Sequence, residues 1–159
     1  MKSTFRLCLA SVLLILLPAC GKKDHDHAAP ATTSGHTHTA PHGGLLVEIG
    51  EHAYNLELVR DAVSGKLTAY FLDGHAENFV RLKATTINLT ATLGAEKQAL
   101  TLRAVANSAT GETVGDTSQF EAHADWLKTT ARFDASVSAL EIRGTRFEKI
   151  GFSFPKSAK

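Results

Sequence analysis

Sulfur is scarce in this chain of 159 residues, which has two cysteines and a single methionine, Met1. Both cysteines, Cys8 and Cys20, lie close to the N-terminus, so the sequence after residue 20 contains neither a thiol nor a thioether. A disulfide framework is therefore excluded for the rest of the chain, whose stability must come from a hydrophobic core. The same scarcity argues against binding of copper(I), because that ion prefers sulfur ligands.

Two further absences narrow the function. The 17 basic residues nearly balance the 16 acidic ones, and the formal net charge of +1 gives no basic surface for nucleic acid. The sequence also contains no Gly-x-Ser-x-Gly and no His-Glu-x-x-His motif. We therefore predict that the protein binds no nucleic acid and is not an enzyme. The alternative is a hydrolytic zinc site in which Glu51 or Glu77 acts as the general base.

Long apolar runs are missing as well. The run Leu7–Leu17 is interrupted only by Ser11, and it is much shorter than the roughly 20 residues that cross a bilayer as a helix. Lys2 and Arg6 precede this run, and small residues follow it. A basic start, a short apolar stretch and a small-residue cleavage site predict a secretory signal peptide over residues 1–19.

Cys20 directly after this site resembles the lipobox of bacterial lipoproteins. The resemblance implies that the chain is cut before Cys20, that its thiol carries a diacylglyceryl group, and that its amine carries a fatty acyl chain such as palmitate. The lipid bilayer is then a partner of the protein, through acylated Cys20. Gly21 follows where an Asp would favour the inner membrane, which implies a periplasm-facing anchor in the cell outer membrane. The alternative is a plain signal peptide followed by a chance cysteine.

Residues 20–41 form a polar segment without any aromatic residue or any aliphatic residue larger than alanine. Such a segment cannot bury enough apolar surface to fold, so we predict a disordered tether. It is rich in imidazole, which suits zinc, copper(II), nickel and cobalt. The alternative is a polar spacer that binds nothing. The predicted metal ligands of the tether are His25, His27, His36 and His38.

From residue 42 to residue 159 the sequence changes to short β-like runs separated by turn residues. Apolar and polar residues alternate, as from Tyr54 to Leu58, where Asn55 and Glu57 fall on the face opposite the apolar side chains. A helical turn over residues 125–128 is predicted to place Trp126 at one end of the core, and residues 107–116 to form the longest loop. The predicted strands cover residues 45–49, 53–59, 66–72, 85–93, 100–105, 120–124, 133–142 and 147–154, with a short run at 79–82. We therefore predict an antiparallel β-sandwich, Ig-like or similar, of eight or nine short strands.

Three histidines of this domain lie in or next to turns: His42, His52 and His75. In a meander the start of the second strand and the end of the third fall at the same end of the sheet, so His52 and His75 can be neighbours. His42 joins them only if the start of the first strand folds over that end. The three are our candidate metal ligands in the domain, with Asp73 and Glu77 beside His75 as additions. Unrelated surface histidines are the alternative.

The run Ala40-Pro41-His42-Gly43-Gly44, together with the strand spacing up to residue 93, resembles a small His-Gly-Gly β-domain. That domain precedes the adaptor (membrane-fusion) subunits of heavy-metal efflux pumps, where it is thought to meet periplasmic metal ions. The resemblance implies that His42 is a metal ligand and that Gly43 and Gly44 allow a tight backbone path. It also implies a metal efflux system or another envelope protein as a partner. The chain lacks the coiled-coil hairpin and the lipoyl-like domain of an adaptor.

Two functions follow from these observations. The first is a membrane-tethered exported protein that binds divalent transition metal ions, zinc or copper(II) above all, and is linked to metal efflux or homeostasis. The second is a non-catalytic structural or interaction lipoprotein that docks on an envelope partner.

Overall fold

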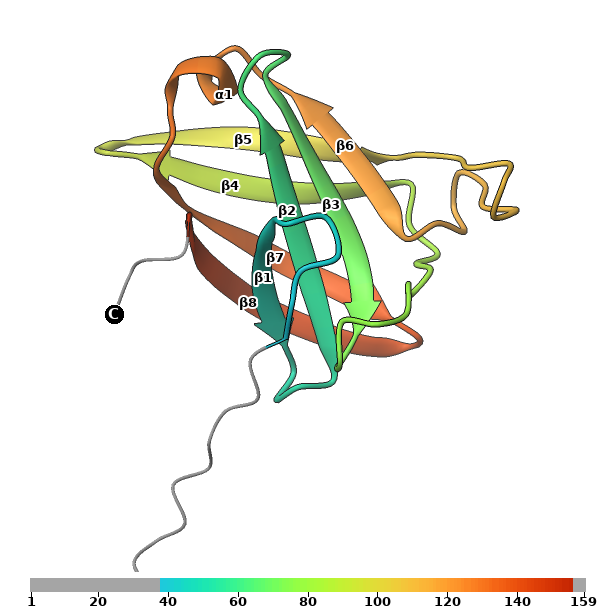
Figure 1. Cartoon of the computed structure of the whole chain (residues 1–159). Helices are drawn as coiled ribbons and strands as arrows, with labels where there is room; N and C mark the ends of the chain where they lie inside the picture. Colours follow the sequence, from blue (N-terminus) through green and yellow to red (C-terminus); the bar gives the residue numbers. More distant parts are fainter. Residues whose placement is uncertain (1–37, 156–159) are drawn as a thin grey trace, which may run out of the picture. The chain divides into compact units, whose positions relative to one another are not determined.

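The computed structural model describes residues 38–155 and contains antiparallel strands and one short helix (Figure 1). None of the helices in this range is long and apolar enough to cross a membrane. The elements are β1 Leu45–Ile49, β2 Tyr54–Asp61, β3 Lys66–Asp73, β4 Thr86–Leu93, β5 Glu96–Ala104, β6 Gln119–His123, α1 Trp126–Thr129, β7 Phe133–Ile142 and β8 Thr145–Phe154. The signal peptide, Cys20 and the tether histidines His25, His27 and His36 lie outside the described residues.

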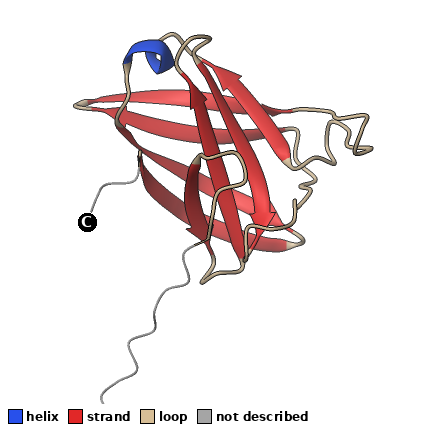
Figure 2. Cartoon of the chain, viewed as in Figure 1, coloured by secondary structure: helices blue, strands red, loops and turns tan. Residues whose placement is uncertain are grey.

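The strands form one sheet in the order β1-β2-β3-β6-β5-β4-β7-β8. Strand β6 joins two local groups of strands, because it pairs with β3 on one side and with β5 on the other. Strands β4 and β5 cross β2 and β3 at a steep angle, so the sheet curls around its own core (Figures 1 and 2). The predicted all-β antiparallel fold is confirmed. It differs from a two-sheet sandwich in that β6 makes the sheet continuous.

The core lies on the concave side of this sheet and follows the predicted alternation. In β2, Leu56 and Leu58 are buried in the core, and β3 contributes Leu67, Ala69 and Phe71. The ring of Phe71 meets that of Phe120 edge to face, with ring centroids 5.7 Å apart. Aliphatic side chains supply most of the remaining core, and each fully buried one contributes about 1.5–3 kcal/mol by leaving water.

Two local predictions are corrected. Residues 79–82 are not a strand but make two isolated bridges, Leu72 with Phe79 and Leu82 with Thr117. In α1 the side chain that closes the end of the core is Leu127, which is fully buried, while Trp126 is half-buried against Phe133. A single helical turn points only one of its neighbouring side chains inward, and the sequence did not show which.

The loop between β5 and β6 is attached to the sheet through a buried carboxylate. Glu112 accepts hydrogen bonds from N and Oγ of Ser118, at 2.8 and 2.7 Å, and from Oγ1 of Thr110 at 2.9 Å. Burial raises the pKa of Glu112, but these hydrogen bonds and the nearby Arg81 guanidinium outweigh it and hold the pKa below its ordinary value of 4.5. The predicted longest loop is thus held at a defined place.

The two outermost strands, β1 and β8, approach each other where the sheet curls round. A Cβ on Gly50, just after β1, would meet the ring of Phe147 in β8, and the rings of Tyr54 and Phe147 lie edge to face at 5.8 Å. No ladder of strand pairing joins β1 to β8 within residues 38–155. Side chains rather than backbone hydrogen bonds therefore close this seam.

Candidate functional site

The His-Gly-Gly segment, defined here as residues 42–44, crosses the outer face of β2. A tight turn leads into it, in which the N–H of Gly43 donates to the carbonyl oxygen of Ala40 at 3.1 Å. Gly43 has a φ of +70°, a conformation in which a Cβ is strained. Gly44 lies so close to β2 that a Cβ there would be 2.5 Å from the carbonyl oxygen of Leu58. Glycine is therefore needed at position 43 for its backbone conformation and at position 44 for its close approach to β2.

Glu57 of β2 holds this segment with its carboxylate. The backbone N–H groups of His42 and Gly44 donate to Oε1 of Glu57 at 2.8 and 2.9 Å. Nδ1 of the His42 ring lies 2.8 Å from Oε2 of the same carboxylate. The Glu57 side chain has no exposed surface, whereas that of His42 keeps 35%. A buried carboxylate is stable only with such donors around it.

The contact with Glu57 fixes the state of the His42 ring. Because an ionised carboxylate offers only acceptors, Nδ1 must carry the hydrogen. In the neutral ring this leaves the lone pair on Nε2, which is the atom a metal ion would bind. Metal-ligating histidines commonly donate their other N–H to a carboxylate in this way.

Two aromatic side chains, Tyr70 and Phe79, lie next to the ring of His42. Its ring stacks on that of Tyr70 with centroids 3.8 Å apart and planes 12° apart, and Phe79 lies 5.9 Å away. Tyr70 is paired with Glu57 across β2 and β3, so both point to the same outer face. Burial, followed by the negative charge of Glu121, raises the pKa of Tyr70 above its usual 10.0. The imidazole is therefore held in one plane by stacking and by its hydrogen bond.

Glu57 was not among the site residues expected from the sequence. The alternation placed it on the outer face, which is correct, but outward residues are usually solvated. What buries it is the His-Gly-Gly segment, which precedes it by 13 to 15 positions. An acidic residue on a strand beside a glycine-rich turn is the one signal that could have suggested the contact.

Two predicted metal ligands meet at the end of β3. The rings of His38 and His75 lie edge to face with their centroids 5.7 Å apart. One comes from the end of the predicted tether and the other from the turn after β3. The backbone thus brings a tether histidine, rather than His42, next to His75.

His52 lies in the neighbouring turn between β1 and β2. Glu51 and His52 have φ values of +50° and +69°, and the N–H of Ala53 donates to the carbonyl oxygen of Gly50. The N–H and Nδ1 of His52 contact the carboxylate of Glu48 at 2.8 and 3.1 Å. Both side chains of this pair are largely exposed.

The predicted set of His42, His52 and His75 is brought together only in part. The carbonyl oxygen of His52 lies against Gly74, directly before His75, so these two turns are neighbours as expected. His42 is instead held over β2 by Glu57. Within residues 38–155, no group of three His, Cys, Asp or Glu side chains is placed to hold a metal ion.

Asp73 and Glu77, the additional candidate ligands beside His75, take part in the turn after β3. Asp73 accepts hydrogen bonds from the backbone of Glu77 and from Asn78, and the Asn78 side chain above all lowers the pKa of Asp73. Asp73 therefore closes a turn. His123 is exposed at the end of β6.

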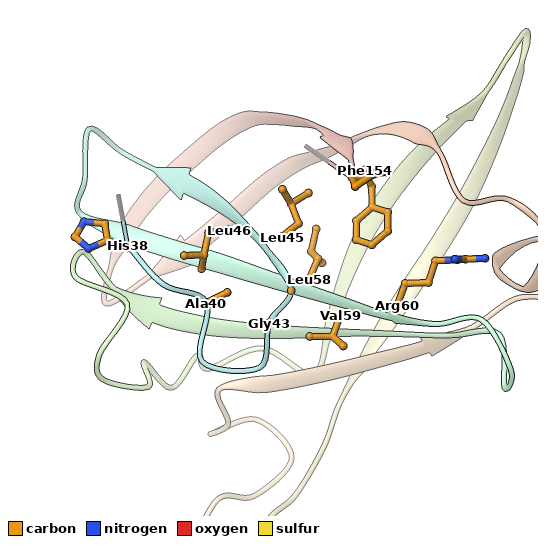
Figure 3. A pocket seen from close by; sticks show the side chains of 11 residues that line it. His38, Ala40, Gly43, Leu45, Leu46, Leu58, Val59, Arg60 and Phe154 are labelled. Atoms are coloured by element: carbon orange, nitrogen blue, oxygen red, sulfur yellow. The ribbon is translucent and has the colours of Figure 1, made fainter. Parts of the chain in front are cut away.

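A cleft of about 540 Å³ opens beside the His-Gly-Gly segment and is lined by residues of β1, of β2 and of the end of β8. Its walls are mainly apolar, with Leu45, Leu58 and Phe154 among them. His38 lies at one end of the cleft and Arg60 at the other (Figure 3). His38 therefore lies next to both His75 and this cleft.

Comparison of the chain with protein-family models, with curated proteins and with solved structures found no match.

Proposed function

We propose that this is an exported, lipid-anchored protein that binds divalent transition metal ions with histidines of its tether and of its β-domain. The observation that carries the proposal is the approach of His38 to His75, with ring centroids 5.7 Å apart. Two imidazoles at this separation can turn toward one ion and leave its other positions to water or to a further histidine. In the sequence, His36 precedes His38 by two positions and is a candidate for such a further ligand.

The state of His42 gives a second line of support. Its Nδ1 faces the buried Glu57 carboxylate, an arrangement that fixes the tautomer and the orientation of a ligating imidazole. Ligands made of imidazole and carboxylate favour zinc, copper(II), nickel or cobalt over copper(I). A tether that collects ions and a domain that presents them would suit a role beside a metal efflux system.

Calorimetric titration of zinc and copper(II) into the full chain, purified in detergent, tests the proposal. We expect the double variant His38→Ala/His75→Ala to lose the tightest class of sites seen in the unmodified chain. His123→Ala is the matched control, because it removes an exposed histidine from a strand far along the chain, and it should bind as the unmodified chain does. Equal binding by the double variant would overturn this site and favour the second function, a structural lipoprotein that docks on an envelope partner.

The anchor is tested separately. Replacing the acylated residue, Cys20→Ser, should move the protein from the membrane fraction to the soluble fraction and abolish incorporation of labelled palmitate. Retention in the membrane without Cys20 would contradict the lipobox. That the chain is not an enzyme stays a prediction.

A further inference from the structure

Glu57 differs from the other acidic residues of the described chain in what its carboxylate binds. Its three hydrogen-bonding contacts, at 2.8, 2.8 and 2.9 Å, all go to the His-Gly-Gly segment. Two of them involve backbone N–H groups and one involves a ring nitrogen. The side chain is fully buried, although it faces outward from β2 between Asn55 and Val59. Its role is therefore to receive this segment.

The buried Glu57 carboxylate stabilises the one position of residues 42–44 in which all three hydrogen-bonding groups reach it. If residues 42–44 moved away, Glu57 would lose all three donors while His42 and Gly44 would lose their acceptor. Gly44 permits the approach because no side chain separates its backbone from that of Leu58. The carboxylate and the glycine therefore act together to fix the segment against β2.

The position of His38 depends on this segment. The hydrogen bond from Gly43 to Ala40 closes the turn that follows His38, so only a short stretch of chain separates His38 from the fixed residues. The pair of His38 and His75 lies at the end of β3. Tyr70 of the same strand stacks on the ring of His42. Release of the segment would free His38 from His75 and His42 from Tyr70 at the same time.

We propose that Glu57 is the positioning residue of the metal site: by holding residues 42–44 it places His38 beside His75 and keeps His42 as the Nδ1–H tautomer with Nε2 available. This inference rests on the proposed function, because it concerns the same site. Glu57 itself does not contact the ion. Its loss should therefore weaken binding without removing any ligand.

The test uses Glu57→Gln in the full chain, with zinc as the probe. Glutamine keeps an oxygen for the two backbone N–H groups but offers an N–H₂ group to Nδ1 of His42, which can accept only in the Nε2–H tautomer. We expect zinc affinity to fall about 10- to 100-fold, as found for other partners of metal ligands. In the metal-free protein, ¹⁵N shifts of the His42 ring should change to those of the other tautomer, and cross-peaks between the His38 and His75 rings should weaken.

Glu148→Gln is the control. Glu148 is an exposed acidic residue of β8 whose carboxylate accepts a hydrogen bond from Nε of Arg146 at 2.8 Å. This variant should leave zinc affinity and the His42 ring unchanged. The backbone amide spectrum checks the fold of both variants. If Glu57→Gln does not fold, Glu57→Asp replaces it. The shorter side chain keeps the carboxylate but moves it away from residues 42–44, and we expect the same loss of zinc affinity.

The outcomes separate the two proposals. Zinc binding by the unmodified chain that persists at full affinity in Glu57→Gln would overturn the positioning role alone. An unchanged His42 tautomer in that variant would do the same. Failure of the unmodified chain to bind zinc or copper(II) would overturn the proposed function, and the positioning role with it.

Discussion

The two adjacent glycines of the His-Gly-Gly segment should respond differently to the same substitution. In Gly44→Ala the new Cβ would lie 2.5 Å from the carbonyl oxygen of Leu58 and 2.9 Å from Cγ2 of Val59. The first of these atoms belongs to the backbone of β2 and cannot turn aside. We therefore expect the segment to lift from the strand and to separate from Glu57.

The size of the effect follows from the contacts that are lost. The segment makes three hydrogen-bonding contacts to one ionised side chain, and each hydrogen bond to a charged group contributes about 1.5–3 kcal/mol. Water would replace part of this once Glu57 is uncovered, which leaves an expected loss of about 3 kcal/mol. Gly43 has open space around it and a φ of +70°. Gly43→Ala should therefore cost only about 1–2 kcal/mol, and Gly43→Asn less, because Asn tolerates the left-handed region.

Urea unfolding followed by the fluorescence of Trp126, the single tryptophan of the chain, measures all three variants. This side chain packs on Phe133, away from the substituted positions, so it reports global unfolding. We expect Gly43→Asn to be the most stable of the three variants, Gly43→Ala to be less stable and Gly44→Ala to be the least stable. A Gly44→Ala protein as stable as Gly43→Asn would refute the argument that close approach to β2 requires glycine at position 44.

Three further predictions concern other parts of the domain. Replacing Glu51-His52 by Asn-Gly should raise the free energy of unfolding by about 1–2 kcal/mol, because both residues have positive φ values and Asn-Gly is the preferred sequence of such hairpin turns; thermal unfolding would measure it. Glu112 has a lowered pKa, so its contribution to stability is present above pH 4.5 and is lost as the pH falls through the folded-state value. Glu112→Gln should therefore be less stable at pH 7 and lose less stability on acidification, in urea titrations across that range. Arg60→Met should destabilise the domain by about 1–3 kcal/mol, because Nε of Arg60 donates to the carbonyl oxygen of Leu127 at 2.6 Å; an unchanged urea midpoint would contradict this role.

Alternation along the chain was sufficient to predict the antiparallel all-β class. It also placed most strands, since residues such as Leu56 and Leu58 point into the core at every second position. It failed at residues 79–82, where apolar side chains accompany two isolated bridges, and at the helix, where Leu127 rather than Trp126 is the fully buried residue. These failures arise where tertiary packing, and not local periodicity, decides the outcome.

The candidate site was predictable in its residue types but not in its pairs. The histidines were evident from the sequence, and the neighbouring turns of His52 and His75 follow from the meander. The pairing of His38 with His75, and the burial of Glu57, depend on how residues 38–44 fold back across the sheet. No periodic pattern in the sequence predicts that path. It is determined by the turn from Ala40 to Gly43, by the close approach of Gly44 to β2 and by the Glu57 carboxylate.

Strand β6 has a consequence for how the protein reaches its folded state. Strands β1 to β3 pair with their neighbours in sequence, and so do β4 with β5 and β7 with β8. The ladder between β3 and β6 instead joins Lys66 to His123, so it must close a long stretch of chain before it gains any contact. Non-local pairings of this kind slow folding. We expect the local hairpins to form early and the docking of β6 against β3 to be the slow step that commits the chain to its folded state.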